Sequence, residues 1–283
     1  MWIALGINGA MLVAEAVGGV LTGSLAVLAD AGHLLSDVGA IGLGLFAASL
    51  AVRPAAARMT FGYQRSEILA ALVNGLLLVG VALAIGWAAL GRLGDPPEID
   101  GLGVLVLGLL GLLGNVAATA VLARGERADL NLEGVLRHSA ADALGSVGVV
   151  VAGAFVLAGG SAVVDPVVSL LIAALILASS WRLIAEPVGV LMEAAPPGVD
   201  VDEAGAAICE EEGVRSVHDL HVWTVTSGFG ALAAHVVVSP ECDRDLVRRR
   251  LELLLHERFG IDHTTLQVEH QPRTLLTIDR KFE

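Results

Sequence analysis

Two histidine–aspartate pairs with the same spacing are the residues best suited to chemistry in this chain. His33 precedes Asp37 by four residues, and His138 precedes Asp142 by four residues. Residues at i and i+4 share one face of a helix, so two such helices packed face to face would bring two imidazoles and two carboxylates together. Four nitrogen and oxygen ligands suit a tetrahedral divalent metal, zinc above all. The alternative is that each pair is a hydrogen-bonded structural pair.

The surroundings of both pairs favour the metal interpretation. Both pairs lie in long apolar runs, where ionisable groups are costly unless they are paired or bound to metal. Zinc binds neutral imidazole and ionised carboxylate, so its binding displaces protons and arriving protons can expel it. We therefore expect an intramembrane site that exchanges a divalent cation for protons when it faces each side in turn.

Composition places the chain in a membrane. Its 283 residues are 55% hydrophobic with mean hydropathy +0.75, whereas soluble domains average about 45–50% apolar residues. The formal net charge of −13 argues against nucleic acid as a partner. Cys209 and Cys242 form no Cys-x-x-Cys motif, so neither a disulfide framework nor a thiolate zinc site is expected. The first apolar run lacks a basic start, so we interpret it as a membrane span and not as a signal peptide.

Six segments are long enough to span a bilayer, which requires about 20 apolar residues. Arginines cluster in the links between spans two and three and between spans four and five, which predicts that both links and both termini are cytoplasmic. We expect a polytopic α-helical protein of the bacterial inner membrane. The expected spans are Trp2–Leu21, Leu25–Ala51, Ile68–Leu90, Leu102–Leu122, Val135–Ala158 and Pro166–Ile184.

The sequence becomes polar after Pro187, which predicts a membrane domain over residues 1–186 and a second domain over 187–283. The second domain contains six of the eight histidines. Its periodicity predicts the order αββαβ, typical of a small α+β domain with helices on one face of a sheet. The expected elements are helices over Val201–Glu212 and Asp243–Phe259 and strands over His218–Thr226, Ala231–Val238 and Thr265–Glu269.

Four stretches together resemble the cation diffusion facilitator family of divalent-metal/proton antiporters. They are Ser24–Asp37, Phe61–Glu67, His138–Asp142 and His218–Trp223. The resemblance implies six spans, a metallochaperone-like cytoplasmic domain, a homodimer, and metal export by alternating access. Histidine at positions 33 and 138 is similar to the zinc-transporting branch, which implies zinc and protons as substrates.

Two other functions remain open beside zinc/proton antiport. One is broader export of divalent cations such as cadmium, cobalt, manganese or iron, and the other is a membrane metal sensor that binds without transporting. An enzyme is not expected, because the His-Glu-x-x-His pattern of zinc proteases does not occur in the sequence.

The resemblance also implies a zinc site in the cytoplasmic domain, where zinc would have a regulatory role. The matching positions are His218, His221, His235, His263 and Glu269, of which His235, His263 and Glu269 match best. Each histidine alone is more often a surface residue. The resemblance further suggests an ion pair between Arg65 and Glu193 at the junction with the membrane. It implies no metal site in the link 53–64, which contains neither His nor Asp, and no metal-collecting histidines in 124–131.

Further polar residues inside the spans have two interpretations. Asp30 lies seven residues before Asp37 on the same helical face, so it either supports the metal site or is solvated near the outer surface. The others either line a pathway or form hydrogen bonds between helices. They are Asn8, Glu15, Asn74 and Asn115.

Overall fold

A computed structural model describes residues 2–56, 58–125, 132–270 and 281–282 of the chain, and side chains over 5–56, 58–117, 120 and 142–270. The chain divides into two compact units. One consists of residues 1–47 and 70–185, and the other of residues 48–69 and 186–283. The second unit therefore includes the link between the second and third long helices as well as the C-terminal domain.

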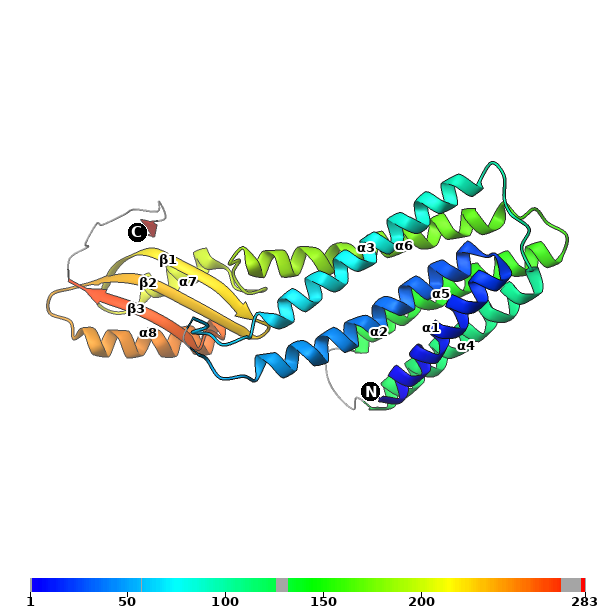
Figure 1. Ribbon diagram of the computed structural model, residues 1–283. Helices are drawn as coiled ribbons and strands as arrows, with labels where there is room; N and C mark the ends of the chain where they lie inside the picture. The colour runs from blue at the N-terminus through cyan, green and yellow to red at the C-terminus, as the bar shows by residue number, and fades with distance from the viewer. Residues whose placement is uncertain (1, 57, 126–131, 271–280, 283) are drawn as a thin grey trace. The chain divides into compact units, whose positions relative to one another are not determined.

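The first unit is a bundle of six long helices (Figure 1). The shortest has 21 residues, which at 1.5 Å per residue gives about 32 Å, enough to cross a hydrocarbon core of about 30 Å. By length and composition, α2, α3, α6 and most of α1 qualify as membrane spans, while α4 and α5 contribute shorter apolar stretches among the described residues. The helices are α1 (Trp2–Thr22), α2 (Leu25–Ala51), α3 (Ser66–Arg92), α4 (Gly101–Gly125), α5 (Leu132–Leu157) and α6 (Val164–Leu191).

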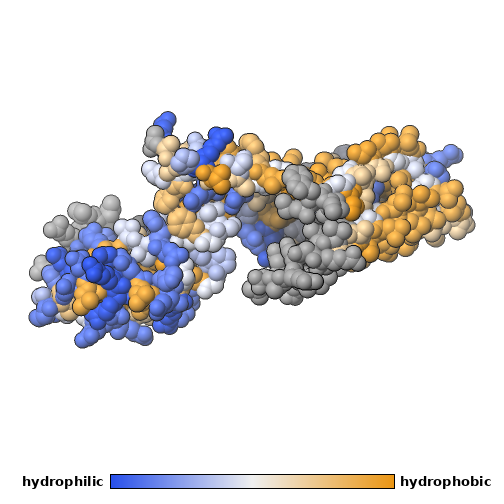
Figure 2. Space-filling model, turned by 90° about the horizontal axis from the view of Figure 1, so that it is seen from below, coloured by the Kyte–Doolittle hydropathy of each residue, from blue (hydrophilic) through white to orange (hydrophobic). Residues whose placement is uncertain are grey.

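The helical unit exposes its large apolar side chains and buries its polar ones. Trp87 is 83% exposed and Trp181 is 72% exposed, and the visible surface of the bundle is mostly hydrophobic (Figure 2). Inside the bundle, small residues such as Ala26 and Ala29 are fully buried, which lets helices approach closely. This distribution is that of an integral membrane domain.

The second unit contains a four-stranded sheet in the order β3-β2-β1-β4. β1 pairs antiparallel with β2 and β4, and β2 pairs parallel with β3. The predicted order αββαβ is confirmed, and a short fourth strand that we did not expect follows it. The elements are α7 (Val201–Glu210), β1 (Val214–Thr226), β2 (Phe229–Val238), α8 (Arg244–Phe259), β3 (His263–Glu269) and β4 (Lys281–Phe282).

The two faces of the sheet differ in composition. On β2, Leu232, Ala234, Val236 and Val238 are buried in one core with residues of α7 and α8. Because side chains alternate along a strand, the odd-numbered residues of β2, including His235, lie on the opposite face. The helices therefore leave one face of the sheet for polar side chains.

A bulge in β1 aligns two histidines on that face. His218 pairs with His235, and His221 pairs with Ala233, so β1 has one residue more than β2 in this interval. The interval contains Asp219, whose φ of 48° lies in the left-handed region. A bulge of this kind shifts the alternation of side chains between the two faces of the sheet by one residue. His218 and His221 thus share a face, although three positions separate them.

Candidate metal sites

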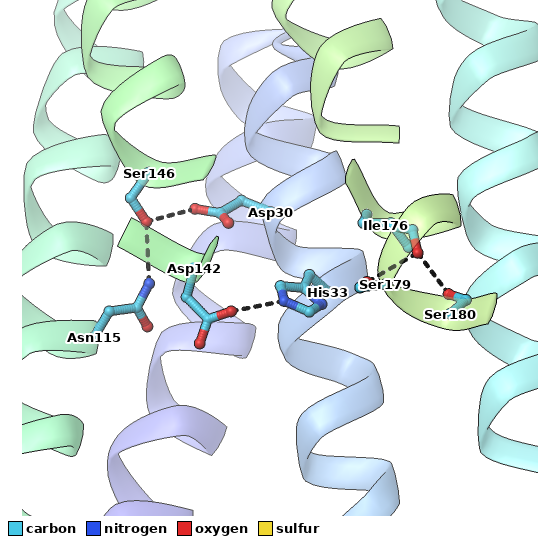
Figure 3. A network of polar contacts seen from close by, with 8 residues as sticks. All are labelled: Asp30, His33, Asn115, Asp142, Ser146, Ile176, Ser179 and Ser180. Carbon is cyan, nitrogen blue, oxygen red and sulfur yellow. Dashed lines mark hydrogen bonds and ion pairs between the residues drawn. The ribbon is translucent and has the colours of Figure 1, made fainter. Parts of the chain in front are cut away.

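The first candidate site lies between α2 and α5. His33 Nε2 is 2.7 Å from Asp142 Oδ1 (Figure 3), and the two side chains are 15% and 13% exposed. One ligand atom from each of His33, Asp37 and Asp142 lies within 4.8 Å of the others. Residues 109 positions apart in sequence thus meet inside the helical bundle. This is the arrangement that their repeated spacing predicts.

The fourth expected ligand, His138, lies in α5 one helical turn before Asp142. Its side chain lies outside the described residues. Residues at i and i+4 share a face of a helix, so its position in α5 is compatible with the expected set. The structure therefore brings three of the four predicted ligands together and describes the backbone of the fourth.

The contact between His33 and Asp142 involves atoms that are suited to bind a metal ion as well as a proton. Both atoms of the 2.7 Å contact are also the atoms that would bind a divalent cation, because zinc is bound by imidazole nitrogen and carboxylate oxygen. A proton held between them must leave before both can bind metal. A metal ion bound to both of these atoms would therefore displace a proton held between them.

A buried polar network lies one turn beyond these residues (Figure 3). Ser146 of α5 donates a hydrogen bond to Asp30 Oδ2 at 3.0 Å, and Asn115 Nδ2 of α4 donates to Ser146 Oγ at 3.1 Å. Asp30 is only 4% exposed, so the solvated alternative for this residue is wrong. Asn115 links α4 to α5, and Ser36 donates to Asn74 at 3.2 Å and links α2 to α3. These two asparagines form hydrogen bonds between helices, one of the two interpretations above.

The second candidate site lies on the helix-free face of the sheet. His218 Nε2 is 3.5 Å and His235 Nδ1 is 3.6 Å from Glu269 Oε1, and the two imidazole rings are 5.0 Å apart. Neither nitrogen has a hydrogen-bond partner among the described residues. Ligand atoms about 2.0 Å from a tetrahedral zinc ion are separated by roughly 3.3 Å. The two nitrogens and the carboxylate therefore fit zinc better than they fit hydrogen bonds to one another.

The neighbouring residue orients one of these ligands. His218 Nδ1 lies 3.2 Å from Asp219 Oδ2. When Nδ1 carries the ring proton and donates it to Asp219, the lone pair of Nε2 is available on the side of Glu269. Carboxylates commonly fix metal-binding histidines in this way. The bulge in β1 thus supplies both the alignment of His218 and the group that sets its tautomer.

Two of the expected cytoplasmic ligands lie elsewhere. His263 is at the other end of β3 from Glu269, about 20 Å away at 3.3 Å per residue, and its ring packs against Phe61 and Phe229. His221 is exposed, further along β1. The structure does not bring His263 or His221 to the group formed by His218, His235 and Glu269. Sequence patterns indicate strands but not bulges, so they could not rank His218 above His263.

The expected ion pair between Arg65 and Glu193 is present within the second unit. Arg65 Nη2 lies 3.8 Å from Glu193 Oε1, with both side chains partly exposed. Both line a cavity of about 970 Å³ that also touches His221 and Trp223. Such an exposed pair contributes roughly 0–1 kcal/mol to stability.

Comparison with known proteins places most of the chain in one family. Residues 1–192 match the cation efflux transmembrane domain, and residues 196–271 match the cytoplasmic domain of cation efflux proteins. The metal cation efflux system protein CzcD of Cupriavidus metallidurans is 42% identical over 274 residues, which cover 95% of this chain and 86% of CzcD. The cadmium, cobalt and zinc/H(+)-K(+) antiporter of Bacillus subtilis is 38% identical over 268 residues, with 93% and 86% covered. The zinc transporter ZitB of Escherichia coli is 37% identical over 271 residues, with 95% and 86% covered. The chain therefore belongs to the cation diffusion facilitator family of cation efflux proteins, and it is a multi-pass integral membrane protein.

Proposed function

We propose that this protein exports zinc from the cytoplasm in exchange for protons. The observation that carries the proposal is the convergence of His33, Asp37 and Asp142 inside an apolar helical bundle. Similarity to the zinc transporter ZitB and to the cadmium, cobalt and zinc antiporter supports it. Because intramembrane ionisable residues are costly, their convergence is best accounted for by a cargo that they bind.

The exchange follows from the protonation chemistry of these side chains. With protons bound, His33 and Asp142 hold each other across the 2.7 Å contact. When zinc arrives from the cytoplasm, the same atoms turn to the ion, with Asp37 and His138 completing four ligands, and the protons leave. When the site opens to the outside, protons restore the contact and zinc is released. Alternating access couples zinc export to proton import because the nitrogen of His33 and the oxygen of Asp142 cannot bind zinc and share a proton at the same time.

The nature of the ligands favours zinc over harder cations. Two imidazoles and two carboxylates suit zinc, whereas a set made only of oxygen atoms would favour manganese. The cadmium and cobalt in the name of the Bacillus antiporter keep broader divalent export as the second candidate. Four protein ligands leave no position for a catalytic water, so we propose transport and no enzymatic reaction.

The second site and the assembly complete the proposal. His218, His235 and Glu269 would hold a resident zinc ion, which would fix the positions of β1, β2 and β3 relative to one another in response to cytoplasmic zinc. We also propose a homodimer with both termini in the cytoplasm of a bacterial cell. The match to the family's cytoplasmic domain and the arginines of the two links support these two statements.

Zinc flux in proteoliposomes tests the transport proposal directly. A zinc dye and a pH dye inside the vesicles are followed together for the wild type, Asp37→Ala and Asp142→Ala, with Asp95→Ala in an exposed loop as the matched control. We expect zinc uptake with opposed proton movement in the wild type and the control, and neither in the two site variants. Zinc binding without flux in the wild type would favour a sensor. Flux in both site variants would show that the transport site lies elsewhere.

A further inference from the structure

Glu15 of α1 is a buried acid to which the exchange described above assigns no part. It is 3% exposed, and neither of its carboxylate oxygens has a hydrogen-bond partner among the described residues. An ionised carboxylate buried without a partner is far too costly to persist. Glu15 therefore needs a bound proton, or a cation near it, for the bundle to be stable.

The carboxyl group of Glu15 lies close to that of Asp30 because two glycines leave room for both. A methyl group placed on Gly111 of α4 would lie 2.7 Å from Glu15 Oε1, 3.4 Å from Ser146 Oγ and 3.6 Å from Asp30 Oδ2. A methyl group on Gly145 would lie 3.3 Å from Asp30 Oδ1. Oxygen atoms from three helices thus surround one position at the surface of α4.

Two carboxyl groups at such close range do not both ionise in a buried place, because their charges repel. Asp30 accepts a hydrogen bond from Ser146, which favours its ionised form. Glu15 receives no such bond among the described residues. Of the two acids, Glu15 is therefore the one to carry the proton.

The pair is one helical turn away from the transport site. Asp30 precedes His33 by three residues on α2, and Ser146 follows Asp142 by four residues on α5. A divalent cation bound to His33, Asp37 and Asp142 would place two positive charges within one to two helical turns of Glu15. In a medium of low polarity, charges at that range interact strongly. Binding of the cation would thus favour loss of the proton from Glu15.

We propose that Glu15 is a second proton-binding residue of the exchanger, which carries a proton while the transport site is metal-free and releases it when a divalent cation binds. The inference rests on the proposed zinc/proton exchange. Glu15 lies seven residues before the end of α1, about 10 Å from the connection to α2, the end that we assign to the outside. His33 lies eight residues after the start of α2, so Glu15 and His33 lie at a similar depth below that end of the bundle.

The groups that face Glu15 from the other helices are few. Asp30 is the acid on α2, Asn115 on α4 and Ser146 on α5 are neutral, and Asp142 is the next acid beyond them. His33 is the nearest basic side chain, and it and Asp37 both interact electrostatically with Asp30. A change in proton count that appears in Glu15→Gln and not in Glu15→Asp therefore follows from the loss of the Glu15 carboxyl group.

Calorimetry of the full-length protein in buffers of different ionisation enthalpy measures the protons released for each zinc ion bound. The variants are Glu15→Gln, Glu15→Asp as the conservative rescue, and Glu98→Gln in an exposed loop as the matched control. We expect Glu15→Gln to bind zinc but to release about one proton fewer near neutral pH. Glu15→Asp and Glu98→Gln should keep the wild-type count. An unchanged count in Glu15→Gln would overturn the proposal.

Infrared difference spectra keep the test decisive if Glu15→Gln does not fold. Zinc added to the wild type should remove the carbonyl band of a protonated carboxyl group, and Glu15→Asp should shift that band. Absence of the band, or a band that Glu15→Asp leaves in place, would overturn the role of Glu15. Failure of zinc/proton exchange as a whole has a different signature, because the wild type would then bind or move zinc without releasing any protons.

Discussion

Ser24 and Asp165, which are 141 positions apart in sequence, are joined by a buried hydrogen bond in which the serine hydroxyl donates to the carboxylate. The same carboxylate accepts hydrogen bonds from the backbone N–H groups of Leu25 at 2.8 Å and Ala26 at 3.2 Å. Asp165 of α6 thus caps the N-terminus of α2, whose N–H groups have no partner within the helix. Its negative charge also complements the helix dipole. The helix that carries His33 and Asp37 is anchored to α6 in this way.

Asp165→Asn should destabilise the membrane unit. The amide keeps one acceptor but loses the charge and places NH₂ where an acceptor is needed, so we expect a loss of roughly 1–2 kcal/mol. Melting of the purified protein in detergent measures the effect. Asp95→Asn, in an exposed loop, is the control and should melt like the wild type. A melting temperature of Asp165→Asn equal to that of the control would show that the cap adds nothing to stability.

His33→Asp should shift the metal preference. The substitution replaces a nitrogen ligand by an oxygen ligand, which favours harder cations such as manganese. We expect the manganese-to-zinc transport ratio to rise on the order of tenfold, which is about 1.4 kcal/mol. Competition between the metals in zinc-flux assays measures it. The control is His256→Asp, on the exposed surface of α8, which should leave the manganese-to-zinc ratio unchanged. A wild-type ratio in His33→Asp would exclude His33 as a selectivity ligand.

The membrane helices and the shared helical face of His33 and Asp37 could be predicted because both depend on local sequence. Apolar runs of fixed length determine the spans, and the spacing of His33 and Asp37 determines which residues share a face. The cap formed by Asp165 could not be predicted, because an Asp-Pro at the start of α6 resembles an ordinary N-cap of its own helix. Only the packing of α6 against α2 turns its carboxylate to a different helix.

The cytoplasmic site could be predicted only in part for a related reason. Strand periodicity places His235 correctly, but the bulge at Asp219 shifts the register by one residue, and a bulge has no clear sequence signal. The sequence leaves the role of Glu15 open, because an acid that is buried between helices and an acid that lines a pathway have the same sequence pattern within one span. Its significance depends on Gly111, a residue 96 positions away.

Cys209 should react slowly with alkylating reagents in the folded protein. Burial raises the pKa of its thiol above the ordinary value, and a hydrogen bond with the backbone of Val217 offsets part of that effect. The thiolate is the reactive form, so a raised pKa means less thiolate at any given pH. In a Cys242→Ser background, iodoacetamide should modify Cys209 several-fold more slowly in the native protein than in denaturant. The modification rate should also rise with pH in both states, and the midpoint of this rise should lie at a higher pH in the native protein than in the denatured protein. Equal native and denatured pH profiles would contradict this.

Zinc should stabilise the cytoplasmic unit through His218, His235 and Glu269. A ligand that binds only the folded state at 100 times its dissociation constant adds about 2.7 kcal/mol of stability. Zinc should therefore raise the melting temperature of the full-length protein in an Asp37→Ala background, where the transport site is disabled. His235→Ala in that background should abolish the rise, since it removes one of two nitrogens within 3.6 Å of Glu269 Oε1. Removal of zinc by a chelator should return the melting temperature to its starting value.

His263→Ala is the matched control for this experiment, because it removes a histidine from the same face of the sheet at the other end of β3. It should lose the packing of its ring against Phe61 and Phe229, which lowers the melting temperature with and without zinc by the same amount. The zinc-dependent rise itself should remain. If His263→Ala abolished that rise and His235→Ala did not, the metal would be bound at the His263 end of the sheet, and the assignment to His218, His235 and Glu269 would be wrong.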